Sequence, residues 1–337
     1  MKLDLGKRDR VLPNTRLNLI VTATGLVSLG VYTLLQVYAP PRRLAYSDEM
    51  LEAARVMAKA VALIGSHCDR HGIPIDERID PNHTGLVGPE HSGLATTLGN
   101  LEAKRTTTNP NVAGLVVHLL HQAGVARGDT VVVGCSASFP GLMVATLAAA
   151  EAMGVRPIVI LSLGASSFGG TRMDFDLLDI YELLLRDGVI ASPPAAASLG
   201  GERDIAAELE EDARQRLIRQ IEKSGVTFIH EPDLQQNVSR RMRIYQESSG
   251  GARISAFINI GGSYANLGTS ELALALQPGL NTRVEIPAKP ERGVLFEMAA
   301  SGVPCIHLLF IRGLAAKYGL PWDPVPLPAP GVFSPGK

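Results

Sequence analysis

The sequence predicts an α/β fold in which a mostly parallel sheet carries helices on both faces, preceded by one N-terminal transmembrane helix. From residue 109 onward, apolar runs of strand length alternate with helical segments, which is typical of βαβ units. These runs are continuously apolar, as in strands that are buried on both faces. An uncharged run of 22 residues near the N-terminus predicts the membrane span.

Composition excludes several classes of protein. The 337 residues are 46% hydrophobic, which is enough for a sizeable core and excludes a disordered chain. A net charge of −1 and an aromatic content of 5% give no argument for a nucleic-acid partner. The cysteines, Cys68, Cys135 and Cys305, form no Cys-x-x-Cys pair, so we expect neither a disulfide framework nor a cysteine zinc site.

The uncharged run extends from Leu17 to Tyr38. As a helix it would span about 33 Å, against about 30 Å for the hydrocarbon core of a bilayer. A buried core helix and a cleavable signal peptide are the alternatives, but the run is longer than an ordinary signal-peptide core. Five basic residues precede the run and two to four follow it. We therefore expect a single-pass protein of the cell membrane, with its N-terminus in the cytoplasm and its main domain outside.

The sequence divides into five parts. They are a short basic segment (1–16), the transmembrane helix (17–38), a helical stalk and polar loop (39–108), the α/β domain (109–320) and a Pro-rich tail (321–337). Apolar residues recur at helical spacing from Ser47 to Ile64, which predicts the stalk helix. The polar region 65–109 is too long for an ordinary connection, so we expect an ordered functional loop there. Six prolines in the tail predict that it lacks a packed core.

Each element of the α/β domain is predicted from its apolar pattern and its flanking turn residues. Asn109 and Pro110, for example, suit the cap and first position of a helix. Strands are predicted at 130–133, 157–163, 226–229, 254–260 and 305–311, and helices at 110–122, 140–153, 176–186, 205–223, 234–247 and 294–300.

Three loops rich in Ser and Gly follow predicted strands, at 134–141, 164–170 and 261–266. Taken singly, each could be a tight βα turn. Because ligands bind outside the carboxyl ends of parallel strands, we expect the loops to gather around one cleft, with residues 102–105 folding over it. The substrate-binding candidates in these loops are Ser138, Ser166, Ser167, Gly261, Gly262 and Ser263.

Ser136 is the candidate nucleophile. Gly134-x-Ser136 after a strand matches the start of the nucleophile elbow of α/β hydrolases, although Ser138 stands where the final glycine is expected. The sequence singles out no Asp or His as its partner. Cys135 is a weaker candidate, since a lone cysteine beside a strand more often belongs to the core.

A charged cluster lies in the polar loop. Glu102 is a candidate acid or base, and Lys104 and Arg105 could hold carboxylates or phosphates; a solvated charge cluster is the alternative. A basic stripe at helical spacing is formed by Arg240, Arg241 and Arg243. It could bind a polyanion, but a solvated helix face is the simpler interpretation.

No cofactor or metal ion is expected. His118 and His121 are too few for a metal site. No Gly-x-Gly-x-x-Gly follows a strand and no P-loop motif occurs, so dinucleotide and ATP sites are not supported.

Four stretches together resemble the bacterial family of poly-gamma-glutamate system proteins. They are TGLVGPE (84–90), TTLGNLEAKRTTTNPN (96–111), SASFPG (136–141) and SLGG (198–201). The resemblance implies a role in the synthesis or export of the γ-linked glutamate polymer, with the polymer and other subunits of that complex as partners. It implies a pathway rather than a reaction, and it brings no catalytic residues.

The leading hypothesis is a membrane-anchored accessory protein that binds poly-γ-glutamate, or a glutamate-containing piece of it, at the strand-end loops. One alternative is a serine-type hydrolase or transferase that acts on γ-glutamyl amides, with Ser136 as its nucleophile. The other is a scaffold without catalytic activity for the membrane subunits of the synthase.

Overall fold

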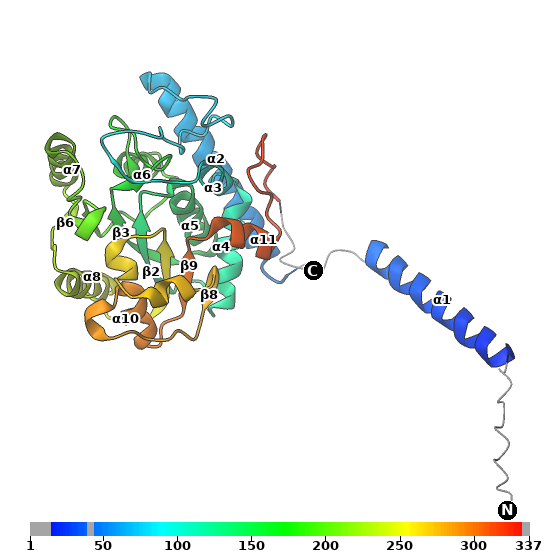
Figure 1. Cartoon of the computed structure of the whole chain (residues 1–337). Helices are drawn as coiled ribbons and strands as arrows, with labels where there is room; N and C mark the ends of the chain where they lie inside the picture. Colours follow the sequence, from blue (N-terminus) through cyan, green and yellow to red (C-terminus); the bar gives the residue numbers. More distant parts are fainter. Residues whose placement is uncertain (1–14, 39–43, 332–337) are drawn as a thin grey trace, which may run out of the picture. The chain divides into compact units, whose positions relative to one another are not determined.

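The computed structural model describes residues 15–38 and 44–331 (Figure 1). The chain divides into two units, one with the N-terminal helix α1 (Thr15–Tyr38) and one that starts at Leu44. Most of the predicted basic segment 1–16 lies outside the described residues.

Helix α1 has 24 residues and contains the predicted span 17–38. Its side chains are described from Asn18 to Leu34, and all of them are exposed. Across the described part of the chain, no helix is both long and apolar enough to cross a membrane. The structure therefore gives no support to the expected transmembrane helix.

The second unit is an α/β structure with a mostly parallel sheet, as predicted (Figure 1). The sheet has the strand order β6-β5-β3-β2-β7-β9-β8, and only β8 runs antiparallel to its neighbour. Its strands are β2 (Thr130–Ser136), β3 (Arg156–Ser162), β5 (Ala196–Ser198), β6 (Thr227–Ile229), β7 (Ile254–Ile260), β8 (Gly279–Asn281) and β9 (Cys305–Leu308). A separate parallel pair joins β1 (Ala95–Thr97) to β4 (Ala165–Ser166).

The order of the strands reverses between β2 and β7. From β2 the chain builds outward through β3, β5 and β6 on one side, and it later adds β7 and β9 on the other. In open parallel sheets, such a switch point leaves a crevice at the carboxyl ends of the two central strands. The topology therefore predicts a ligand site beside Ser136 and Gly261, where β2 and β7 end.

Helices cover both faces of the sheet, as the continuously apolar strands require. Along β2, Val131 and Val133 pack into one core cluster, whereas Val132 packs into the other. The larger cluster includes α2 (Ser47–His71), α4 (Asn111–Gln122), α5 (Pro140–Met153), α6 (Leu177–Arg186), α7 (Glu211–Ser224) and α11 (Ile311–Tyr318), and the smaller includes α8 (Leu234–Ser249) and α10 (Val294–Ala300). The shorter helices are α3 (Leu101–Thr107), α9 (Tyr264–Leu267) and the 3₁₀ turns η1 (Glu202–Asp204), η2 (Glu271–Ala275) and η3 (Lys289–Glu291).

Two predictions about the ends of the domain are wrong. The helix predicted as a stalk is a core helix, because Met50, Met57 and Ile64 of α2 are fully buried and α2 packs on α4 and α5. The described part of the Pro-rich tail is also packed, since Trp322 and Leu327 lie against the main core.

Two predicted elements have different bounds. The helix expected from residue 205 begins only at Glu211, because Arg203, Asp204 and Ala206 have positive φ angles of 54°, 62° and 52°. The strand expected to reach residue 311 stops at Leu308, where the chain turns into α11.

A close contact fixes the position of α3 over the sheet. Gly141 lies in the first turn of α5, and a Cβ atom there would come within 2.5 Å of the carbonyl oxygen of Thr107, the last residue of α3. Glycine is required for this approach, since no real Cβ atom tolerates such a distance to backbone. The contact brings α3, with its charged side chains, to the carboxyl edge of the sheet.

Candidate functional site

A cavity of about 930 Å³ opens at the carboxyl ends of the central strands, and we call it the strand-end cavity. Ser136 and Ser162, the last residues of β2 and β3, line it, as do Gly262 after β7 and Leu309 after β9. Helix α3 adds Lys104 to the wall. The site thus lies at the switch point of the sheet.

The serine candidates meet in this cavity. Ser136, Ser138, Ser166 and Gly262 all line it, which is the arrangement that the sequence predicted. The hydroxyl of Ser136 donates to Ser138 Oγ at 3.1 Å and accepts the backbone N–H of Ser138 at 3.2 Å. Ser138 Oγ in turn accepts the backbone N–H of Ser166 at 3.0 Å, so hydrogen bonds tie the loop after β2 to β4.

Lys104 is the buried cation in the cavity wall. Its side chain is only 2% exposed, and Nζ donates to the carbonyl of Ser138 and, at 2.7 Å, to Ser166 Oγ. Nζ also lies 3.9 Å from the centre of the Phe139 ring. Among the described residues, no carboxylate forms an ion pair with it. Because burial disfavours the charged form, the pKa of Lys104 falls to about 7.

The rim combines charged and apolar groups. Glu202 and Glu208 line one part of the cavity, and Glu208 accepts the backbone N–H of Glu202 at 2.8 Å. Arg312 also lines it, with its guanidinium 4.7 Å from the centre of the Trp322 ring. Two large apolar side chains, Leu98 at 85% and Phe310 at 60% exposure, line it as well.

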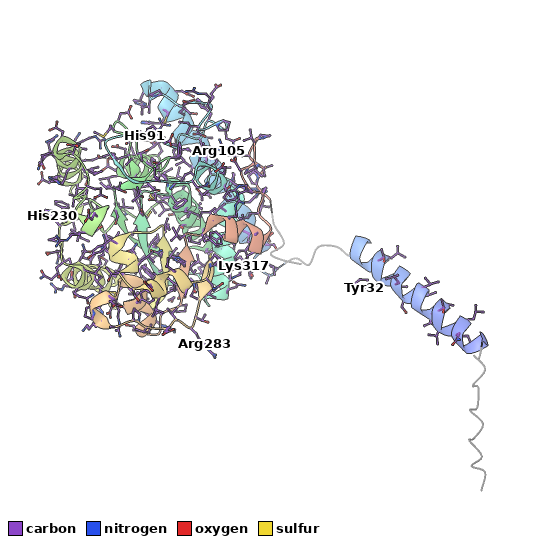
Figure 2. All side chains as sticks on the ribbon, in the orientation of Figure 1. Tyr32, His91, Arg105, His230, Arg283 and Lys317 are labelled. Atoms are coloured by element: carbon purple, nitrogen blue, oxygen red, sulfur yellow. The ribbon has the colours of Figure 1, made fainter. Side chains whose placement is uncertain are left out.

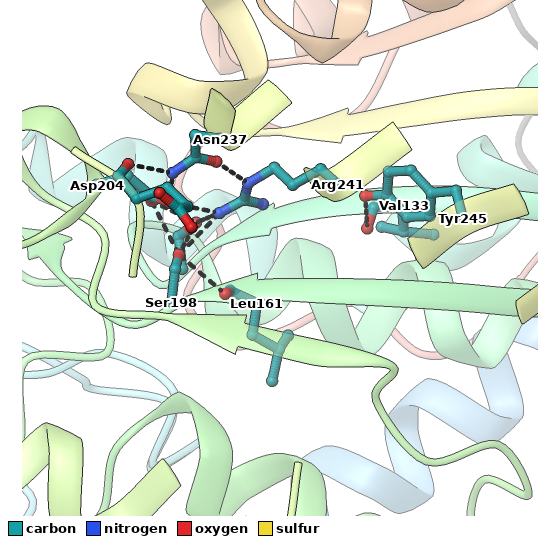
Figure 3. Close-up of polar contacts among 9 residues, drawn as sticks. Val133, Leu161, Ser198, Asp204, Asn237, Arg241 and Tyr245 are labelled. Atoms are coloured by element: carbon teal, nitrogen blue, oxygen red, sulfur yellow. Dashed lines mark hydrogen bonds and ion pairs between the residues drawn. The ribbon is translucent and has the colours of Figure 1, made fainter. Parts of the chain in front are cut away.

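A buried polar cluster around Arg241 lies next to the cavity, and Figure 3 shows its polar contacts. Arg241 is fully buried, and its Nη2 lies 2.7 Å from both Asp204 Oδ2 and Ser198 Oγ. Nη2 also donates to Ser162 Oγ, at 3.2 Å, on the cavity wall. Asn237 donates to Asp204 and accepts from Arg241 Nε. The ion pair anchors the strained turn around Asp204, from which Glu202 reaches the rim.

Arg241 is a residue that the sequence interpretation missed. The sequence predicts it on a solvated basic stripe with Arg240 and Arg243. In the structure, Arg241 lies on the buried face of α8. The spacing of Asn237, Arg241 and Tyr245, four residues apart, places them on one face of the helix and could have indicated this. All three are buried in the structure.

Of the remaining predicted loop residues, two lie outside the cavity wall and one lines it. Ser167 is buried and its hydroxyl donates to the carbonyl of Thr97 at 3.4 Å. Gly261 is buried with a φ of +78°, and it packs against the Ser136 side chain. Ser263 does line the cavity, and its hydroxyl has no hydrogen-bond partner among the described residues.

The charged cluster of the polar loop is divided by helix α3. Lys104 points into the cavity, whereas Glu102 accepts a hydrogen bond from Asn100 Nδ2 at 2.7 Å outside the lining. Arg105 forms a two-pronged ion pair with Asp323 of the tail, with Nε–Oδ1 at 2.7 Å and Nη2–Oδ2 at 2.5 Å. The structure therefore places Arg105 at the tail rather than beside Lys104 as a second carboxylate clamp.

The polar loop also contains Glu90 and His91. His91, labelled in Figure 2, is 83% exposed beside Glu90. Neither residue lines the cavity. Within residues 15–38 and 44–331, no group of three or more His, Cys, Asp or Glu side chains could hold a metal ion. All three cysteines are buried and free.

Comparisons of the chain with models of protein families, with curated proteins and with solved structures found no match.

Replacing Arg105 with Ala should release the tail. Asp323 is 18% exposed, and it would lose its partner in a mostly buried pair. Breaking a fully buried pair costs about 3–5 kcal/mol, so we expect a loss of about 2 kcal/mol in the free energy of unfolding and faster proteolysis of residues 321–331. Arg78→Ala is the matched control, because Arg78 is 90% exposed in its pair with Asp76. Unchanged cleavage of the tail would contradict this role.

Replacing Lys104 with Met should change how stability depends on pH. The pKa of Lys104 is about 7 in the folded protein against an ordinary 10.5, so between these values the unfolded chain binds more protons. Wild-type stability should therefore rise, relative to Lys104→Met, by up to about 1.4 kcal/mol per pH unit from pH 7 to 10. Urea unfolding at pH 7, 8 and 9 measures this, with Lys59→Met as an exposed control. Parallel curves for wild type and Lys104→Met would show that the amine is not desolvated.

Proposed function

We propose that the protein is an accessory protein of poly-γ-glutamate production and that it binds a chain end of this polymer in the strand-end cavity. The observation that carries the proposal is the combination of groups in one cavity at the switch point. Arg312 and a wall of serine hydroxyls suit carboxylates, while Leu98 and Phe310 suit the methylene groups between them. The four family-like sequence stretches support the choice of polymer.

The acidic part of the rim favours a chain end over the middle of the polymer. Each internal residue of poly-γ-glutamate presents a carboxylate, which Glu202 and Glu208 would repel. The terminal residue with a free amino group presents an ammonium as well. A cavity with Arg312 and the two glutamates matches that pair of opposite charges.

Binding of short γ-glutamate oligomers tests this proposal. We expect Arg312→Ala to weaken binding about fivefold, since an exposed charge pair contributes about 1 kcal/mol, and the loss should shrink in high salt. An oligomer with an acetylated amino terminus should bind more weakly than the free one. Arg283→Ala is the control, because this arginine (Figure 2) is exposed and does not belong to the cavity lining. Equal affinity of both oligomers would refute the chain-end mode, and no binding of either would refute the function.

We also propose that residues 17–38 anchor the protein in the cell membrane, with the N-terminus in the cytoplasm and the α/β unit outside. The run carries no charge over 22 residues. Leu19, Leu26 and Val27 are each more than 60% exposed on α1, so transfer into lipid would remove this apolar surface from water.

Fractionation of cells tests the anchor. The full chain should sediment with membranes and require detergent for release, whereas a chain that starts at Leu44 should not. A reporter enzyme fused to the C-terminus should be active only when it is of a type that works outside the cytoplasm. A full chain recovered without detergent would overturn the anchor, and a cytoplasmic reporter signal would overturn the orientation.

A further inference from the structure

We propose that Ser166 and Lys104 form a nucleophile and general-base pair that cleaves or transfers γ-glutamyl amides in the strand-end cavity. The choice of γ-glutamyl amides rests on the proposed function, whereas the pair itself rests on geometry.

The two reacting groups are in contact. Lys104 Nζ lies 2.7 Å from Ser166 Oγ, which is hydrogen-bond distance, and both residues line the cavity. Ser166 ends strand β4, is half-buried and lines the cavity, whereas Lys104 is only 2% exposed. A hydroxyl within reach of an amine base is the arrangement that activates serine in Ser–Lys enzymes.

Fixed neighbours orient both groups. The carbonyl of Ser138 accepts from Lys104 Nζ, and Ser138 Oγ accepts the backbone N–H of Ser166. Ser138 thus positions both the base and the nucleophile. The centre of the Phe139 ring lies 3.9 Å from Lys104 Nζ. Among the described residues, no charged side chain accounts for the lowered pKa of Lys104, which burial alone brings to about 7. A substantial fraction of the amine is therefore neutral at neutral pH and can accept a proton.

The contacts of Ser136, the nucleophile expected from the sequence, do not favour that role. The Ser136 hydroxyl is hydrogen-bonded only to Ser138 within the described chain, and no base contacts it. Ser136 is also only 5% exposed. Glu102 lies outside the cavity lining and cannot serve as its base there.

The reaction balances without a cofactor. Ser166 Oγ bonds to the carbonyl carbon of the amide as its proton passes to neutral Lys104. The carbon–nitrogen bond then breaks, and Lys104 gives that proton to the departing amine, which leaves a γ-glutamyl ester on Ser166. Water, or the amine of another chain, attacks the ester carbonyl while Lys104 takes its proton. The carbon–oxygen bond to Ser166 breaks, and the serine oxygen recovers the proton from Lys104.

A fluorophosphonate probe tests the pair independently of the polymer. With the full chain in detergent, we expect the probe to label Ser166, as mapped by peptide mass spectrometry. The labelling rate should rise tenfold per pH unit below about pH 7 and level off above it. Lys104→Met keeps the aliphatic chain and should slow labelling at least 100-fold, since general-base catalysis contributes about 10²–10⁴-fold. Ser239→Ala and Lys59→Met change exposed residues away from the cavity and should leave labelling unchanged.

Chain length and binding of poly-γ-glutamate separate this inference from the proposed function. We expect wild type to shorten the polymer with release of new amino groups, and Ser166→Ala to bind it without shortening. Binding without labelling or shortening refutes the pair and leaves the binding function. Labelling of Ser166 without polymer binding refutes the proposed function and leaves the pair. Labelling at Ser136, or a pH-independent rate in wild type, also refutes the pair, and thermal melting checks that each variant is folded.

Discussion

The desolvation of one lysine amine dominates the site. Lys104 is almost completely buried at the carboxyl edge of the sheet, and among the described residues its amine is hydrogen-bonded to Ser138 and Ser166 and lies against the Phe139 ring. An unpaired ammonium in such a place is unfavourable, so the folded protein holds this group near the point of losing its proton. Helix α3, the loop after β2 and strand β4 all serve to enclose it.

A second unfavourable arrangement lies next to the cavity, which it contacts through Ser162. Arg241 and Asp204 form an ion pair with at most 1% exposure to solvent, and the turn around Asp204 has three residues other than glycine with positive φ. Desolvation of such pairs often outweighs their attraction, and left-handed backbone costs further free energy. Strain and buried charge of this kind cluster at functional sites, which agrees with a cavity built for a ligand rather than for stability alone.

The sequence predicts the parts of this structure that follow from local pattern. Strands β2, β3 and β7 are continuously apolar, and the serine and glycine loops after them meet as the parallel topology requires. The short strands β1, β4, β5 and β8 escape prediction because none of them lies in an apolar run of strand length, and backbone pairing alone defines them. The equally short β6 is predicted because it lies within the run 226–229 between a helix-ending glycine and the next helix. The nucleophile–base contact between Lys104 and Ser166 spans 62 positions, so spacing along the chain carries no sign of it.

Glycines in the family-like stretches mark the points where the chain crosses itself around the cavity. Gly99 packs on the carbonyl of Ser167, Gly141 on that of Thr107, and Gly88 on that of Gly169, and a Cβ atom at any of them would collide with backbone. These stretches are therefore explained first by close packing that assembles the cavity. Lys104 lies between the contacts made by Gly99 and by Thr107. These two contacts hold its buried amine at hydrogen-bond distance from Ser166, which the distant strand β4 supplies.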